Sequence, residues 1–464
     1  MPPSATLQMT SHMATKLAPN MAAKLAPNMA AKLAPNMAAK LAPNMATRLA
    51  PRWAPHLART AAPRLASRIA GVALLALGGD ALAQAPVPTG PPNAPEQRPA
   101  FAAQTRAPAL PASAPLRIER VAEGLEYPWG LAFVDNDTAL ITERPGRLRR
   151  VDLRSGSLSA PIGGLPEIDA RGQGGLLDIT LDPDFAHNHR LYLSYAEPRE
   201  GGKNATAVAR AILAPGSQQL DELTVIFRQT PAWASTKHFG SRLVWDTQGH
   251  LYVTLGERSL PEPRQLAQDP HTHLGKVVRI QPDGSIPADN PFAAGQAGAP
   301  AVWSYGHRNI QGAALHPDSG KLWTIEHGPR GGDELNVPLA GRNYGWPVIT
   351  YGEDYSGTPI GEGVTAREGM EQPIYYWDPV IAPGDMTFYQ GTRFPDWHGD
   401  LIIASLSPGG LVRLTLDGER VSGEARLASE LGRVRDVDEG PDGALWALTD
   451  ARDGALVRLL PGRQ

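Results

Sequence analysis

The chain has 464 residues, 44 basic and 47 acidic side chains, a formal net charge of −3, and no cysteine. Disulfides, thiolate metal sites and cysteine nucleophiles are therefore excluded, and the charge balance gives no argument for binding nucleic acid or an anionic membrane. The 48 glycines and 45 prolines indicate many turns, and the length allows either several average domains or one long barrel or propeller.

Residues 13–52 are five tandem octads, namely MATKLAPN, MAAKLAPN three times and MATRLAPR. A proline in every octad prevents a continuous helix, and this period matches no stacked repeat architecture. The octads are interpreted as expanded low-complexity sequence, with a basic tether or targeting extension as the alternative.

A basic segment (59–68), a short apolar run (69–77) and the small-residue motif Ala81-Leu82-Ala83 follow. This order is typical of a secretory signal peptide, and the apolar run is too short to span a bilayer. We predict cleavage after Ala83 and export to the periplasm or medium, with a retained uncleaved anchor as the alternative. Residues 1–83 are thus assigned to the octads plus the signal peptide.

Residues 84–115 are rich in proline and alanine and poor in large apolar side chains. Such a composition buries too little surface to fold, so we expect a flexible, partly polyproline linker. From Leu116 onward the chain changes character, and 116–464 is predicted to be the folded catalytic domain.

A short apolar strand, a polar turn and a second apolar strand recur six times in this domain. The copies start at Leu131, Asp178, Leu243, Ala313, Met386 and Asp436. Repeated β units at this spacing predict an all-β fold, a six-bladed β-propeller. The segment Leu116–Val121 would complete the last blade beside Ala455–Leu460 and close the ring. A pair of β-sandwiches is the alternative, but it gives no reason for six similar hairpins.

Because the loops at one mouth of a propeller converge on its axis, we looked for reactive residues next to the six copies. Gln173 lies between glycines that allow close backbone approach to a ligand, although a turn glutamine fits equally well. His238, in TKHFGSRL, could act as a general base near neutral pH, although most isolated histidines are structural. Arg308-Asn309 could pair with a carboxylate or polarise a carbonyl, or the arginine could bridge two blades.

Arg433 and Arg435 alternate on one face of a predicted strand and need an anion, either neighbouring acids or a polyanionic ligand. Gly328-Pro329 offers two carbonyl groups, and the pair Asp333-Glu334 follows with two carboxylates. Such oxygen donors suit Ca²⁺ rather than zinc, although the spacing is not that of an EF-hand. Together, a base, several cations and a calcium-type loop are what a cofactor with several carboxylates would require.

The chain from about Leu116 to Leu460 resembles the soluble quinoprotein glucose/sorbosone dehydrogenase family, and within it the bacterial aldose sugar dehydrogenases. The resemblance rests on GQGGLLDITLDPDF, KHFGSRLVWD, DNPF, WSYGHRNIQG, EHGPRGGDELN, GRNYGWP, QPIYYWDP and RVRDV-x-x-GPDG. It implies a six-bladed propeller that holds pyrroloquinoline quinone (PQQ) and calcium. It also implies that His238 takes the proton of the anomeric hydroxyl while hydride passes to the quinone, with Arg308 beside the accepting carbonyl.

The resemblance further implies cofactor contacts by Gln173, Asn309, Arg433 and Arg435, and calcium ligation by the carbonyls of Gly328 and Pro329. It places a second, structural calcium at Asp333, Glu334 and the backbone of Tyr344, and sugar contacts at Gln173 and Trp377.

Two positions depart from the family pattern. Lys237 stands where glucose-oxidising relatives carry Asp before the base, and Ser407 stands where the family has a cofactor-binding lysine. Losing that cation could weaken cofactor binding by about 1–3 kcal/mol, unless another residue such as Lys237 replaces it.

We therefore expect a periplasmic, PQQ- and calcium-dependent enzyme that oxidises the C1 hydroxyl of an aldose to the lactone. It would pass electrons to an unidentified acceptor and exist as a monomer or homodimer. A calcium-dependent propeller lactonase and a non-catalytic binding propeller are the alternatives.

Overall fold

The computed structural model describes residues 84–112 and 115–462. The octads and the predicted signal peptide lie outside the described residues. Within the described ranges, no helix is long and apolar enough to cross a membrane.

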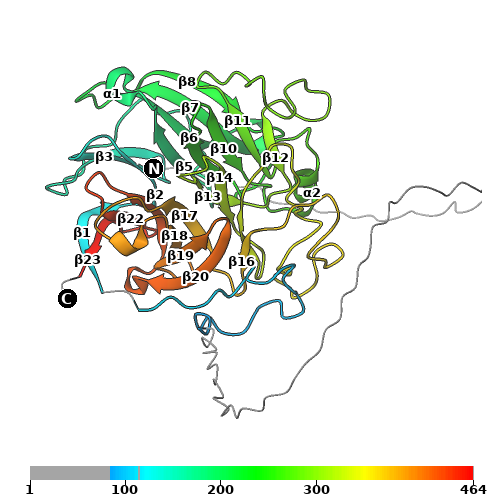
Figure 1. Cartoon of the computed structure of the whole chain (residues 1–464). Coiled ribbons are helices and arrows are strands. Elements are labelled where there is room, and N and C mark those ends of the chain that lie inside the picture. Colours follow the sequence, from blue (N-terminus) through cyan, green and yellow to red (C-terminus); the bar gives the residue numbers. More distant parts are fainter. Residues whose placement is uncertain (1–83, 113–114, 463–464) are drawn as a thin grey trace, which may run out of the picture. The chain divides into compact units, whose positions relative to one another are not determined.

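The described residues fold into six antiparallel sheets, which confirms the predicted six-bladed β-propeller (Figure 1). The first three sheets contain β2 (Pro128–Phe133), β3 (Thr138–Glu143) and β4 (Arg147–Asp152); β5 (Leu176–Leu181), β6 (Arg190–Pro198), β7 (Asn204–Ile212) and β8 (Asp221–Arg228); and β9 (Gly240–Trp245), β10 (Leu251–Leu255), β11 (Lys276–Ile280) and β12 (Val302–Tyr305).

The other three sheets contain β13 (Ile310–Leu315), β14 (Leu322–Glu326), β15 (Asp333–Asn336) and β16 (Tyr375–Trp377); β17 (Pro383–Phe388), β18 (Leu401–Ser405), β19 (Leu411–Asp417) and β20 (Arg420–Leu427); and β21 (Val434–Glu439), β22 (Leu445–Thr449), β23 (Gly454–Pro461) and β1 (Leu116–Leu125). The α-helices of the described ranges are the short α1 (Phe185–Asn188) and α2 (Pro261–Gln265).

The six sequence copies form the first two strands of the six blades. The first strands contact one another around the ring in the order β2, β5, β9, β13, β17 and β21, and β21 contacts β2 again. They are therefore the innermost strands. Their starts, and the turns after the second strands, face the same mouth because the two strands are antiparallel.

The predicted closure of the ring is also confirmed. β1 pairs antiparallel with β23, with Leu116 opposite Pro461 and Ile118 opposite Leu459. The last blade thus takes its outer strand from the start of the domain, and this pairing joins the two ends of the propeller. Between blades, buried apolar side chains form the core, as where Trp323 and Phe388 meet edge to face with centroids 5.4 Å apart.

Residues 84–112 are packed against the propeller, so the expectation of a flexible linker is wrong for this part. Gln104 is fully buried, and its side chain donates to the carbonyl of Pro373 over 2.8 Å. Residue 109 forms a parallel bridge with Glu424 on β20, and Figure 1 shows this blue segment running along that blade. Composition misled here because a segment that hydrogen-bonds to an already formed blade needs no apolar core of its own.

Candidate active site

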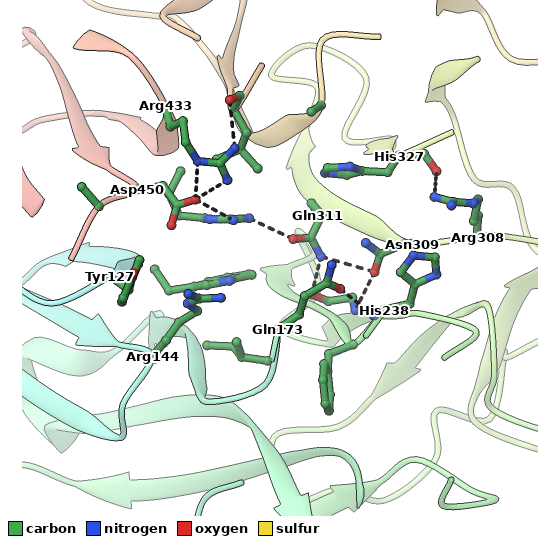
Figure 2. Close-up of a pocket in the computed structure, with 18 of the residues that line it drawn as sticks. Tyr127, Arg144, Gln173, His238, Arg308, Asn309, Gln311, His327, Arg433 and Asp450 are labelled. Carbon is green, nitrogen blue, oxygen red and sulfur yellow. Dashed lines mark hydrogen bonds and ion pairs between the residues drawn. The ribbon is translucent and has the colours of Figure 1, made fainter. Parts of the chain in front are cut away.

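A cavity of about 510 Å³ lies at the mouth of the propeller where loops from several blades meet (Figure 2). All six residues predicted as base or cofactor contacts line it: Gln173, His238, Arg308, Asn309, Arg433 and Arg435. Figure 2 shows Arg433 on one side, His238 and Arg308 on the other, and Gln173 between them. The volume falls in the range usual for small-molecule and cofactor sites.

The cavity is strongly cationic. Its lining includes five arginines (Arg144, Arg308, Arg433, Arg435 and Arg452) against one carboxylate, Asp450. Asp450 Oδ2 lies 2.5 Å from Arg433 Nη2 and 3.4 Å from Arg435 Nη2. Although burial opposes it, these two cations hold the pKa of Asp450 below its usual range. The arrangement thus leaves an excess of positive charge for an anionic ligand.

Several of these arginines have a buried N–H donor without a hydrogen-bond partner in the described part of the chain. The buried Nε atoms of Arg144, Arg308 and Arg435 have no hydrogen-bond partner among the residues that the structure describes. Burial also lowers the pKa of Arg435, and the neighbouring arginines add to this effect. Buried donors without partners are costly, so the oxygen atoms of an anion would stabilise them.

His238 is held in a fixed orientation immediately before β9. Its backbone adopts a left-handed conformation with φ of 51°, and its backbone N–H donates to Gln173 Oε1 over 2.8 Å. On the ring, Nδ1 lies 3.2 Å from Oε1 of the fully buried Glu257. Glycine is required at position 256, because a Cβ there would lie 2.2 Å from the His238 carbonyl oxygen. The close approach of these two loops places the histidine beside its carboxylate partner.

The environment keeps His238 neutral. Burial, followed by the charge of Arg308, lowers the pKa of His238 to about 4, while Glu257 opposes the shift. With Nδ1–H donated to Glu257, the other ring nitrogen, Nε2, carries a free lone pair at neutral pH. A histidine in this state can accept a proton from a ligand in the cavity.

We therefore expect His238 in the cofactor-free protein to titrate near pH 4, well below the usual value for histidine. Because its folded-state pKa is depressed, the neutral base predominates above about pH 4 and is lost as the pH falls through that value. An NMR titration of the ring protons, assigned with the His238→Gln variant, measures this pKa. A midpoint near 6.5 would show that burial and Arg308 do not act on the ring as described.

Arg308 and Asn309 are positioned by one buried acid and by the backbone. The Arg308 N–H donates to Glu326 Oε2 over 2.6 Å, and Arg308 Nη1 donates to the His327 carbonyl over 2.9 Å. Asn309 Oδ1 accepts from the N–H of Gly240 over 3.1 Å. Both side chains are thereby fixed next to the loop that carries His238.

The predicted calcium loop follows His327 at the end of β14. Gly328 and Pro329 do not line the cavity, although His327 does. The Gly328 N–H donates to Asp333 Oδ1 over 2.8 Å, and the N–H groups of Ile381 and Ala382 donate to Asp333 Oδ2 over 2.8 and 2.7 Å. Asp333 therefore holds this loop to the next blade. Its expected role as an ion ligand stays a prediction, since Oδ1 accepts a single N–H and keeps a lone pair.

Glu334 and the Tyr344 backbone are the other two predicted ligands of the second ion. Burial and the nearby carboxylate of Glu326 raise the pKa of Glu334. The ring of Tyr344 stacks on His307 with centroids 4.8 Å apart. Among the described residues, no group of three or more histidines and acids is placed to hold a metal ion.

Trp377 lies outside the cavity, and this contradicts its predicted contact with the sugar. Its side chain is buried in the core between two blades, and its Nε1 donates to Glu424 over 3.1 Å. Lys237 and Ser407 are exposed, and neither lines the cavity. Lys237 therefore does not replace the family's lysine, whereas Arg144 and Arg452 supply cations that the sequence analysis missed.

The missed residues share one place in the fold. Arg144, Glu257 and Asp450 each follow the second strand of a blade, namely β3, β10 and β22. Those turns face the same mouth as the loops before the first strands. Taking the turn after each second strand as a candidate region would have found all three from the sequence.

The six-bladed propeller and its cationic cavity with a buried histidine agree with a match of residues 125–458 to the family described as Glucose / Sorbosone dehydrogenase. The chain belongs to this family of enzymes.

Three known proteins each align with about three quarters of this chain. The chain is 43% identical over 353 residues to the aldose sugar dehydrogenase YliI of Escherichia coli strain K12, covering 75% of this chain and 94% of the relative. A crystal structure of a glucose dehydrogenase is 48% identical, with a TM-score of 0.72, covering 75% of this chain and 100% of that one. The PQQ-bound aldose sugar dehydrogenase of Streptomyces coelicolor is 29% identical, with a TM-score of 0.62, covering 76% and 100%.

Proposed function

We propose that this protein is a PQQ- and calcium-dependent aldose dehydrogenase, exported to the periplasm, that oxidises the C1 hydroxyl of a sugar to the lactone. The observation that carries the proposal is a neutral, buried histidine at the wall of a cavity whose other side chains are mostly cationic. The solved structure of a PQQ-bound relative supports the choice of cofactor.

The residues of the cavity fit PQQ, which carries three carboxylates. Arg433 and Arg435 lie side by side, and the unpartnered Nε of Arg435 leaves a donor for one carboxylate. Arg144, on the same side of the cavity as Arg433 in Figure 2, offers a second such donor. When bound, the quinone supplies a two-electron acceptor for the hydride of C1.

The chain itself supplies the base and its orientation. His238 Nε2 takes the proton of the C1 hydroxyl as the C1–H bond breaks, which leaves the C1 oxygen as the lactone carbonyl. The Glu257 carboxylate, held as an anion by His238 and Arg308 despite its burial, stabilises the imidazolium that forms. Arg308 places a fixed cation near the reacting atoms, where it stabilises negative charge that develops during transfer.

Calcium would be held by the carbonyls of Gly328 and Pro329, hard oxygen donors that no hydrogen bond among the described residues occupies. The close turn supports this role, since a Cβ at Gly328 would lie 2.2 Å from the Gly332 carbonyl oxygen. A second calcium at Asp333, Glu334 and the Tyr344 backbone stays a prediction, and a cation there would relieve the repulsion between Glu334 and Glu326.

Titrating PQQ into the cofactor-free protein by calorimetry tests the two cofactors together. We expect PQQ to bind at least about tenfold more tightly with Ca²⁺ than with EDTA, since the ion would neutralise the cofactor's carboxylates. Mg²⁺, which demands a smaller octahedral site, is the control and should substitute poorly. Equal affinities in Ca²⁺ and EDTA would remove calcium from the proposal.

The two alternative functions have less support. A calcium-dependent lactonase would need acidic side chains that converge on one ion, and the described residues hold no such group. A propeller that had become a binding protein would be expected to have lost the base or its cations, whereas His238, Arg308, Arg433 and Arg435 all line the cavity.

A further inference from the structure

Tyr355 is an exposed aromatic residue at the cavity. Four large apolar or aromatic side chains are exposed in the described part of the chain: Phe101, Ile286, Leu339 and Tyr355. Tyr355 is the most exposed of them, at 73%, and the one that lines the cavity. A large ring left in water at a ligand site, where it contributes little to the fold, indicates a binding role.

Tyr355 lies in a loop whose base is fixed beside the predicted calcium loop. Arg330, which follows Gly328-Pro329, exchanges two backbone hydrogen bonds of 2.9 and 3.0 Å with Glu353. Their side chains also pair, with Arg330 Nη1 2.7 Å from Glu353 Oε1. The loop is therefore held where its tip reaches the mouth of the cavity.

The tip itself is a tight turn that does not use the tyrosine side chain. Asp354 Oδ1 accepts from the backbone N–H and the hydroxyl of Ser356 over 3.0 and 2.9 Å. The Asp354 N–H donates to the Thr358 carbonyl, and the Gly357 N–H donates to the Asp354 carbonyl. These bonds form whatever residue stands at position 355, so substitutions there should leave the loop intact.

The other tyrosine, tryptophan and phenylalanine rings of the cavity already have partners. Arg144 lies over Tyr127 at 4.7 Å, Arg242 over Trp129 at 4.4 Å, and Arg258 over Phe239 at 3.7 Å. Among these lining rings, Tyr355 has no aromatic or cationic stacking partner within the described residues. Its faces are therefore free to contact a ligand.

We propose that Tyr355 stacks on the apolar face of the aldose ring and sets the affinity of the enzyme for its sugar, while proton transfer stays with His238. A pyranose presents hydroxyl groups around its edge and C–H groups on its faces, and an aromatic ring covers such a face well. This inference rests on the proposed function, because it assumes that the ligand is a sugar. It gives the sugar an aromatic contact in place of Trp377.

Sugar binding is measured without turnover in the PQQ-loaded His238→Gln variant, by calorimetry with the aldose that the wild type oxidises best. Adding Tyr355→Ala should raise the Kd of the sugar about tenfold, whereas Tyr355→Phe should keep it within about twofold. In the active enzyme, Tyr355→Ala should raise KM by the same factor and leave kcat within about twofold. Phe101→Ala, at an exposed aromatic outside the cavity, is the matched control and should change neither quantity.

An unchanged sugar Kd in Tyr355→Ala would overturn this inference. So would a loss of bound PQQ in that variant, since it would assign Tyr355 to the cofactor rather than the sugar. If the His238→Gln parent binds no sugar and the wild type reduces no acceptor, the proposed function itself fails, and the role of Tyr355 fails with it.

Discussion

Replacing His238 with glutamine abolishes sugar oxidation, with kcat falling by at least about 10³-fold, because the substitution removes the general base. PQQ should stay bound, since the arginines that would hold it are unchanged. Glutamine is chosen because it fills a similar volume and cannot accept the proton. The residue is only 6% exposed, so a smaller one would leave a cavity.

Single-turnover dye reduction, with bound PQQ quantified by its absorbance, separates loss of chemistry from loss of cofactor. His273→Gln is the matched control. His273 is a half-buried histidine whose partial burial also lowers its pKa, to about 4, but it does not line the cavity. We expect near-normal turnover from the control. Near-normal turnover from His238→Gln would remove the histidine from its role.

Replacing Arg308 with glutamine lowers kcat by about 10²–10³-fold, because a fixed cation beside the reacting atoms is lost. The variant should also raise the pKa of His238, since the charge of Arg308 is one cause of its depression. The effect on kcat should exceed the effect on KM, because the cation acts on charge that develops during the reaction. Arg308→Lys keeps the charge and should recover part of the loss.

The measurement is kcat at saturating sugar and PQQ, together with the NMR titration of His238. Arg393→Gln serves as the control, because Arg393 lies in a partly exposed pair with Asp442, outside the cavity. Wild-type kcat in Arg308→Gln, with PQQ bound, would contradict the assigned role of the cation.

The blades were predictable because their signal is local. Each blade begins with two strands joined by a short polar turn, so strand alternation over a few residues is enough to reveal them. The join between β1 and β23 was predictable for a different reason: a propeller needs its first and last blades to meet, and the apolar segment at Leu116 had no other place.

The wrong predictions concern residues whose position depends on tertiary contacts. The packing of residues 84–112 depends on the edge of a blade formed far along the chain. The composition of the segment itself gives no information about that edge. For Trp377, sequence similarity carried over the residue type, but the direction of the side chain depends on the strand pairing that places it in the core. For Asp333, the sequence does not reveal the three backbone N–H groups that donate to its carboxylate, because they come from its own loop and from the loop before β17.

The site was predictable in outline because its loops lie directly before the inner strands. Arg144, Glu257 and Asp450 follow the second strands of their blades. They reach the same mouth because each second strand runs antiparallel to the first. Glu257 shows the consequence. The sequence indicated His238 as a base, but only the fold shows the carboxylate that orients its ring.

Sugar-dependent dye reduction by the cofactor-free protein after reconstitution with PQQ and Ca²⁺ tests the central claim most directly. Reduction should require PQQ and an aldose with a free C1 hydroxyl, and the product should be the lactone. No reduction with any aldose, in protein shown by its absorbance to contain PQQ, would contradict the claim that this cavity oxidises sugars.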